Sequence, residues 1–241
     1  MKVLDKTVDG LDKVLNFIIY SLFLILLIFG IYSLRSSLAI LDDSELPKDI
    51  VKFRPNKRLS LEELKKINKD IVGWIRINNT HIDYPIVQGK DNIEYLNKDY
   101  KREFSLSGSI FMDYRNNPLE ADPYTVIFGH NMDREKMFGD VNNFKDMTYF
   151  KKHKKGKLYL GKNVYKIKLY AYMLVDGYSN MIYDINQYHN GINEKLINFI
   201  ESSADVYLKT EISTKDKLIV LSTCSRSDEK KRTILIGKIK S

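Results

Sequence analysis

The segment from Phe17 to Leu34 constrains this chain most, because eighteen consecutive positions carry no charge. A helix rises about 1.5 Å per residue, so this segment just spans a hydrocarbon layer roughly 30 Å thick. Tyr20 and Tyr32 lie near its ends, where aromatic rings favour the membrane interface. The segment is apolar on all sides and opens the chain, which disfavours a core helix. We therefore predict a single transmembrane helix.

The basic residues around this segment predict its orientation. Lys2, Lys6 and Lys13 precede it, whereas Arg35 and Lys48 are the only basic residues among the next fifteen. This bias places the N-terminus in the cytoplasm. A cleaved signal peptide is the alternative, since residues 37–39 resemble a cleavage site, but signal apolar regions are usually about 7–15 residues long. We expect a cytoplasmic segment at 1–16, an anchor at 17–34, a stalk at 35–58 and an extracellular domain at 59–241.

The charge of the chain lies outside the anchor. Residues 1–34 hold three Lys and three Asp, so the formal net charge of +8 belongs to the exterior part. Its lysines are scattered and partly balanced by acids, whereas a nucleic-acid site gathers basic and aromatic residues on one element. This charge suits a soluble surface near anionic lipids and wall polymers. We expect no nucleic-acid partner, and a monomer once the anchor is removed.

The composition also restricts cofactors. One Cys excludes an intramolecular disulfide and a multi-cysteine zinc site, and the four His are dispersed without ligand spacing. No Gly-rich phosphate loop follows an apolar strand pattern. We therefore expect neither a metal nor a cofactor.

The exterior part has the pattern of a mainly β domain. Ser60 and Glu63 fit a capping box before a short helix that ends near Asp70, and a second helix is predicted at about 193–203. Short apolar runs separated by turn residues predict strands at Ile71–Ile77, Ile82–Val87, Ser109–Met112, Tyr124–Phe128, Val164–Val175, Lys217–Thr223 and Arg232–Ile239. This pattern predicts a β-barrel or sandwich with helical insertions.

The single cysteine, Cys224, ends an apolar run at the start of a polar loop. Seven polar residues follow it before a second apolar run begins, which is the pattern of an antiparallel hairpin. The hairpin places Arg232 opposite or near Cys224, where a guanidinium can hold an anionic oxygen. A lone Cys is more often a small core residue. However, a free thiol at a strand end outside the cell is a liability unless it is used.

A thiolate enzyme also needs a group that transfers protons. His130 follows the apolar run Tyr124–Gly129, so it lies at a strand end like Cys224. His81 has the surroundings of a turn residue, while His153 and His189 lie in polar stretches that indicate solvated surface. His130 is therefore the best candidate of the four for acid–base chemistry.

These residues resemble those of a known family. Residues 221–224 (LSTC), with Arg232 eight positions later, resemble the active-site segment of sortases, the membrane-anchored cysteine transpeptidases of Gram-positive bacteria. Residues 128–132 (FGHNM) resemble the histidine segment of class B sortases in particular. Further segments that resemble this class, in the same order, lie at 73–77, 82–88 and 108–114.

The resemblance implies a fold, a site and two partners. The fold is a closed β-barrel with N-terminal and inserted helices. The implied catalytic residues are His130, Cys224 and Arg232, and the implied substrate-binding residues are Asn92, Leu96, Ile182 and Ser222. The implied substrates are secreted proteins with a C-terminal sorting signal, and the implied acceptor is an amine of a cell-wall peptide precursor. Three positions depart from the family pattern, namely Val220, Met181 and Ser225.

The implied chemistry proceeds through a thioester. Cys224 attacks a Thr carbonyl of the sorting signal, Arg232 and a backbone N–H hold the oxyanion, and His130 protonates the leaving amine. Three alternatives remain open: a pilin-polymerising sortase, a hydrolytic cysteine peptidase and a catalytically idle membrane-tethered binding module. The first often carries a lid before the barrel, and residues 35–58 lack its Asp-Pro-aromatic pattern.

Overall fold

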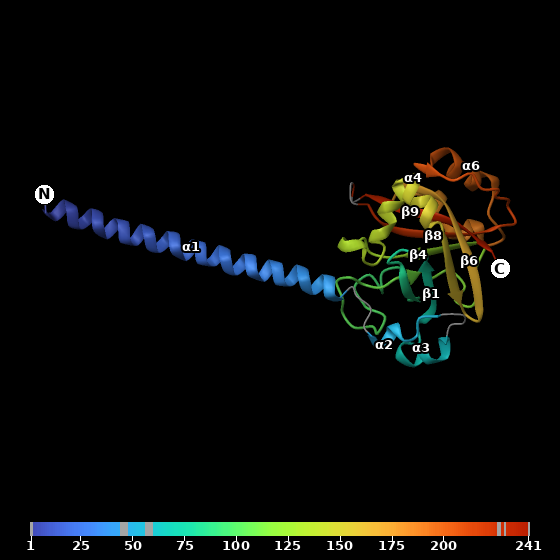
Figure 1. Cartoon of the computed structure of the whole chain (residues 1–241), viewed down its shortest axis with the longest axis horizontal. Coiled ribbons are helices and arrows are strands. Elements are labelled where there is room, and N and C mark those ends of the chain that lie inside the picture. The colour runs from blue at the N-terminus through green and yellow to red at the C-terminus, as the bar shows by residue number, and fades with distance from the viewer. Residues whose placement is uncertain (1, 44–47, 56–59, 226–227, 229, 241) are drawn as a thin grey trace. The chain divides into compact units, whose positions relative to one another are not determined.

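The computed structural model describes residues 2–43, 48–55, 60–225, 228 and 230–240 (Figure 1). Internal contacts divide the chain after Asp42. The described residues of the first unit all belong to one helix, α1, which spans Lys2–Asp43 and so ends one residue past the division. Within it, Gly10–Leu38 is long and apolar enough to cross a membrane. This helix contains the predicted anchor and extends beyond both of its ends. The predicted division into cytoplasmic segment, anchor, stalk and domain stays a prediction, and residues 44–47 and 56–59 of the stalk lie outside the described residues.

The second unit is built around nine strands among the described residues. Their bounds are β1 Ile71–Ile77, β2 Asp83–Val87, β3 Phe111–Met112, β4 Tyr124–Phe128, β5 Lys155–Leu160, β6 Asn163–Asp176, β7 Val206–Tyr207, β8 Lys217–Cys224 and β9 Lys231–Lys240. β1 and β4 have the bounds that the sequence predicts. β5 and β7 were not predicted.

The strands pair in the order β5-β1-β2-β3-β4-β8-β9-β6-β7, and a further pairing of β5 with β6 closes the ring. Eight of the described strands therefore form a closed barrel, with β7 added beside β6. Most neighbours are antiparallel, but β4 runs parallel to β8 and β2 runs parallel to β3. The predicted closed barrel is confirmed, and the sandwich alternative is not.

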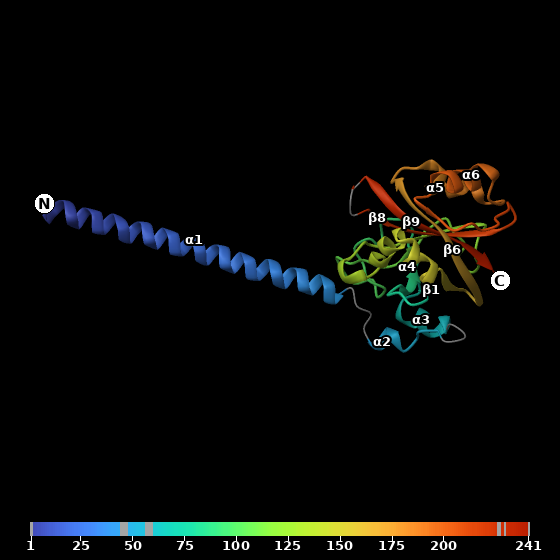
Figure 2. The ribbon, with the colours of Figure 1, turned by 45° about the horizontal axis from the view of Figure 1, so that its top comes forward.

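Helices cover two sides of the barrel (Figure 2). On one side lie α2 (Lys48–Val51) and α3 (Leu61–Ile67), and Ile50 and Leu64 pack there against β1. On another lie α5 (Asn180–Tyr183) and α6 (Glu194–Ser203), while α4 (Met147–His153) precedes β5. The described residues also form three 3₁₀ helices, at Asp133–Glu135 (η1), Gly139–Lys145 (η2) and Ile185–Tyr188 (η3).

The ends of two helices test the predicted capping. Asn193 precedes α6 and its side chain accepts a hydrogen bond from the Leu196 N–H, which is the usual role of an N-cap. Ser60 precedes α3 as predicted, but its side chain makes no capping hydrogen bond, so the predicted capping box is not formed. The short α3 is held instead by its buried Leu64.

Alternate residues of β4, β8 and β9 face two different cores. Ile127, Leu221 and Leu235 face the barrel interior, whereas Val126 and Val220 face a second core covered by α5, η3 and α6. The central strand β8 is therefore buried on both faces, which explains its continuous apolar run. The parity matters for function, because Ser222 and Cys224 continue the outer row that begins with Leu218 and Val220.

Candidate active site

Cys224 and Arg232 form the last pair of the ladder between β8 and β9. Directly opposite residues project on the same face, with Cβ atoms about 4.5–5.5 Å apart. The predicted placement of Arg232 opposite Cys224 is confirmed. Cys224 is exposed, as a nucleophile that meets a polypeptide substrate must be.

A parallel strand pair brings His130 and Cys224 to the same edge of the barrel. Phe128 of β4 is the register partner of Ser222 of β8, so the two strands end at the same edge of the barrel. His130 lies two residues beyond Phe128, just as Cys224 lies two residues beyond Ser222. The Asn131 side-chain amide donates to the Cys224 carbonyl oxygen at 2.7 Å, which ties the two strand ends together.

The imidazole of His130 has a defined partner. Its Nε2 lies 2.8 Å from the carbonyl oxygen of Leu96, which belongs to the connection between β2 and β3. A carbonyl oxygen only accepts hydrogen bonds, so this contact is a hydrogen bond when Nε2 carries the proton. The other ring nitrogen, Nδ1, is then the one available for proton transfer.

A pocket of about 300 Å³ gathers these residues. It is lined by six of the seven predicted site residues, namely Asn92, Leu96, His130, Ser222, Cys224 and Arg232. The seventh, Ile182, belongs to α5 and is fully buried, with its side chain packed into the core. Its neighbour Tyr183 lines the pocket instead, because consecutive residues of a helix point in different directions.

Tyr183 forms part of the pocket wall that the sequence did not predict. Its hydroxyl lies 2.9 Å from the Ser222 hydroxyl, and its ring stacks on Phe128 with centroids 6.2 Å apart. Burial raises the pKa of Tyr183 to about 12, against the opposing effects of the Ser222 hydrogen bond and the Arg232 charge, while the nearby Cys224 raises it further. Tyr183 is therefore neutral at physiological pH.

An ion pair joins the walls of the pocket. The Arg115 guanidinium donates to both carboxylate oxygens of buried Asp113, at 2.8 and 2.7 Å, and also to the Tyr183 carbonyl oxygen. The Asn92 side-chain amide donates to the same carboxylate at 2.8 Å. The Asp113 hydrogen bond raises the pKa of Arg115. Asn92 and Tyr183, from distant parts of the chain, are thus held by one pair.

Among the described residues, one group of three could offer metal ligands. His81, Glu135 and Asp140 place one ligand atom each within 4.8 Å of one another. Buried Asp140 already accepts hydrogen bonds from the His81 backbone and the Tyr149 hydroxyl. These contacts indicate that the group has a structural role, because they hold the turn before β2 in place. None of the three lines the pocket of Cys224.

The chain is similar to known sortases in sequence and structure. A family model of the sortase domain matches residues 75–240. Sortase B of Listeria monocytogenes is 33% identical over 216 residues, which cover 87% of each chain. A Streptococcus pyogenes class B sortase involved in pilus biogenesis is 34% identical, with a TM-score of 0.69, over 75% of this chain and 98% of that one.

Two solved complexes of sortase B are also similar to this chain. The Staphylococcus aureus sortase B–substrate complex is 30% identical with a TM-score of 0.66, over 75% of this chain and 84% of that one. Sortase B complexed with triglycine is 30% identical with a TM-score of 0.67, over 75% of this chain and 85% of that one.

Proposed function

This chain belongs to class B of the sortase family and is a cysteine transpeptidase, and we propose that it anchors secreted proteins to the cell wall. In this proposal it cleaves a C-terminal sorting signal and joins the new C-terminus to an amine of a cell-wall peptide. The observation that carries the proposal is the meeting of Cys224, Arg232 and His130 in one pocket at the edge of the barrel.

The first half-reaction forms an acyl-enzyme. The Cys224 thiolate attacks a Thr carbonyl of the sorting signal, and a C–S bond forms. Arg232 and a backbone N–H hold the negative oxygen of the tetrahedral intermediate. His130 gives a proton from Nδ1 to the amine as the C–N bond breaks, and a thioester remains on Cys224.

The second half-reaction transfers the acyl group. An amine of the cell-wall peptide attacks the thioester carbonyl, His130 takes a proton from that amine, and the Cys224 thiolate leaves. The sortase B complexes with a substrate and with triglycine support a sorting-signal donor and a peptide acceptor. The reaction as written needs no cofactor.

The pocket residues define a substrate groove in the same proposal. Asn92, Leu96 and Ser222 contact the sorting signal, together with Tyr183. Ile182 supports this surface from beneath, since its side chain packs from α5 into the core.

The long helix α1 suggests where the reaction takes place. The apolar stretch Gly10–Leu38 suits a membrane anchor or a signal sequence. We propose that it is an uncleaved anchor, with the N-terminus in the cytoplasm and the catalytic domain outside the membrane. A tethered enzyme meets secreted proteins and lipid-linked wall precursors at the same surface.

Pilin polymerisation is the second candidate, because the Streptococcus pyogenes relative is involved in pilus biogenesis. The acceptor would then be a Lys of a pilin rather than a wall peptide. Among the described residues, Cys224 is exposed, and those that line its pocket all lie at or beyond Asn92. This open pocket favours wall anchoring.

The experiment incubates the full chain, in detergent, with a fluorescent sorting-signal peptide. We expect a thioester on Cys224 by mass spectrometry, and transfer to an added glycine peptide in preference to water. Cys224→Ala should abolish both without changing thermal unfolding. Turnover by Cys224→Ala would end the proposal, product release only by water would indicate a peptidase, and an inert wild-type thiol would indicate a binding module.

A further inference from the structure

The connection between β2 and β3, residues 88–110, holds the imidazole of His130. It supplies Asn92 and Leu96 to the pocket, and the Leu96 carbonyl oxygen accepts the hydrogen bond from His130 Nε2. The orientation of His130 therefore depends on how firmly this connection is fixed. Within it, the described residues form no strand, and an isolated bridge joins Lys98 to Phe104.

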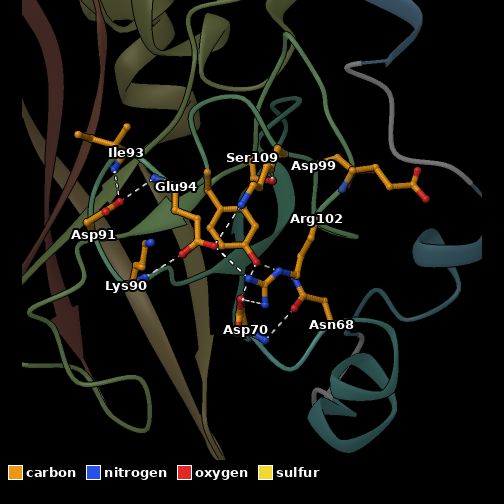
Figure 3. A network of polar contacts seen from close by, with 12 residues as sticks. Asn68, Asp70, Lys90, Asp91, Ile93, Glu94, Asp99, Arg102 and Ser109 are labelled. Atoms are coloured by element: carbon orange, nitrogen blue, oxygen red, sulfur yellow. Dashed lines mark hydrogen bonds and ion pairs between the residues drawn. The ribbon is translucent and has the colours of Figure 1, made fainter.

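One arginine joins this connection to the barrel. The Nη1 atom of Arg102 lies 3.0 Å from the Asp70 carboxylate, and its Nη2 atom lies 3.0 Å from the Glu94 carboxylate. Asp70 immediately precedes β1, and its carbonyl oxygen accepts a hydrogen bond from Gln88 after β2. Glu94 lies two residues before Leu96. Figure 3 shows the Arg102 guanidinium between the carboxylates of Asp70 and Glu94. We call these three residues the ionic clamp.

A buried tyrosine fixes the same turn from the inside. The Tyr95 hydroxyl donates to the Asp70 carboxylate and accepts from the Asn68 amide, both at 2.8 Å. The Tyr95 carbonyl oxygen accepts from the Ser109 N–H at the other end of the connection. The Asp70 carboxylate thus contacts both Arg102 and Tyr95. Because Asp70 immediately precedes β1, these contacts fix residues 95 and 96 relative to the barrel.

Gly108 shows how closely this turn approaches His130. Its φ is +57°, and a Cβ there would lie 3.0 Å from His130 Cδ2 and still closer to the Leu96 carbonyl oxygen. The backbone of residue 108 therefore packs directly on the hydrogen bond between Leu96 and His130. No free space separates the connection from the imidazole here, so a shift of the connection would also move the imidazole.

The backbone of Arg102 indicates that its side chain is in use. Its φ is 74°, a left-handed conformation that residues other than Gly, Asn and Asp adopt rarely. The turn is formed by Asp99, whose side chain accepts from the N–H groups of Lys101 and Glu103. The turn itself does not require an arginine at position 102, since Gly or Asn would adopt this conformation with less strain. Such strain persists where the surrounding contacts require that residue.

We propose that the ionic clamp of Asp70, Glu94 and Arg102 positions the Leu96 carbonyl oxygen, and so keeps His130 in the tautomer with its proton on Nε2. This inference rests on the proposed role of His130 as the proton donor and acceptor. Arg102 is a positioning residue, since it touches neither Cys224 nor the pocket. Its effect is to leave Nδ1 free for transfer.

The test compares two arginines of matched exposure in the full chain, of which Arg102 joins two carboxylates and Arg54 contacts one. Arg102 and Arg54 have side chains that are each 42% exposed, and their partners Asp70 and Asp83 are 19% and 18% exposed. Arg102→Ala should lower kcat about tenfold, within the roughly 10²-fold that a 1 Å misplacement can cost. Arg54→Ala should leave kcat unchanged. Arg102→Lys should restore part of the loss, because an ammonium can satisfy one carboxylate but not span both.

A spectroscopic measurement separates positioning from loss of structure. Chains labelled with ¹⁵N-histidine report the tautomer of each imidazole at about pH 8.5, where histidine is ordinarily neutral. The His130 signals, identified with a His130→Gln variant, should show the proton on Nε2 in the wild type and in Arg54→Ala. Arg102→Ala should move population to the Nδ1–H form while the thermal unfolding midpoint stays close to that of Arg54→Ala.

Two outcomes have separate meanings. If Arg102→Ala keeps both the wild-type tautomer and the wild-type kcat, the clamp has no positioning role and this inference is overturned. If His130→Gln turns over substrate normally, the proposed function of His130 fails, whereas a tautomer shift in Arg102→Ala would still support the clamp.

Discussion

Replacement of Arg232 tests the proposed oxyanion site most directly. Arg232 is the register partner of Cys224 on β8 and of Val175 on β6, so strands on both sides fix its backbone. Arg232→Ala removes the guanidinium and leaves the ladder intact. Arg232→Lys keeps the charge but loses the planar fork of donors. The pair of variants therefore separates charge from geometry.

The expected loss is catalytic rather than structural. A cross-strand pair at a ladder end contributes about 0.2–1 kcal/mol to stability, so Arg232→Ala should unfold at nearly the wild-type temperature. One lost oxyanion donor lowers kcat by about 10²–10³, or roughly 2.7–4 kcal/mol of transition-state stabilisation. We expect a loss of at least this size in Arg232→Ala. Arg232→Lys should not rescue it, because a point charge cannot reproduce the donor geometry.

The assay is steady-state cleavage of a sorting-signal peptide, with Lys231→Ala as the control. Lys231 is adjacent in sequence and exposed, but alternation along β9 directs it to the opposite face, where its register partner on β6 is Asp176. Lys231→Ala should retain wild-type kcat. Arg226→Ala, at a position outside the described residues, should do the same. If Arg232→Ala keeps more than about a tenth of kcat, or if Arg226→Ala is the crippled variant, the assignment of the oxyanion donor is wrong.

Three further predictions concern the pocket wall and two buried tyrosines, Tyr183 of that wall and Tyr84 of the barrel core. Asp113→Asn leaves the largely buried Arg115 cation without its carboxylate, so we expect about 3 kcal/mol less stability in urea unfolding and a higher KM; an unchanged midpoint would contradict this. Tyr183→Phe removes the hydrogen bond to Ser222 and should cost about 1 kcal/mol, whereas a stabilised variant would show that this contact is unfavourable. Burial raises the pKa of Tyr84 and Tyr183 from 10.0 to about 12, so the folded state holds these protons more tightly than the unfolded state. Their contribution to stability is complete below about pH 10 and is lost between pH 10 and 12, and a urea midpoint that stays constant over that range would refute it.

The strands that the sequence predicted share a local signal. β1 and β4 carry apolar runs between turn residues, and β8 carries a run that is buried on both faces. β5 was missed because Lys155, Gly156 and Lys157 begin it, and only its pairing with β6 and β1 makes them a strand. The predicted capping box at Ser60 failed for the related reason that packing, rather than the cap, holds α3.

The residues of the site also fall into those that the sequence predicts and those that only the structure reveals. The hairpin placed Arg232 opposite Cys224 from sequence alone, because a strand, a polar loop and a second strand leave few registers. Tyr183, Asp113 and Arg115 were missed, since each is defined by contacts with residues far away in the chain. An acid and a base two positions apart after β3 were the only local signal for that ion pair. The burial of Ile182 on the core side of α5 likewise follows from the helix orientation.

The parallel pairing of β4 and β8 explains why some site residues could be predicted from the sequence and others could not. β4 and β8 run in the same direction, so His130 and Cys224 leave the barrel at one edge, and β9 starts its return from that edge with Arg232. Strand pairing alone therefore assembles the three groups that the chemistry needs. The remaining part of the pocket is formed by the long connection of residues 88–110, which no strand pairing fixes. Its position depends on Tyr95, Gly108 and the ionic clamp, and these long-range contacts set the imidazole with an accuracy that strand order cannot provide.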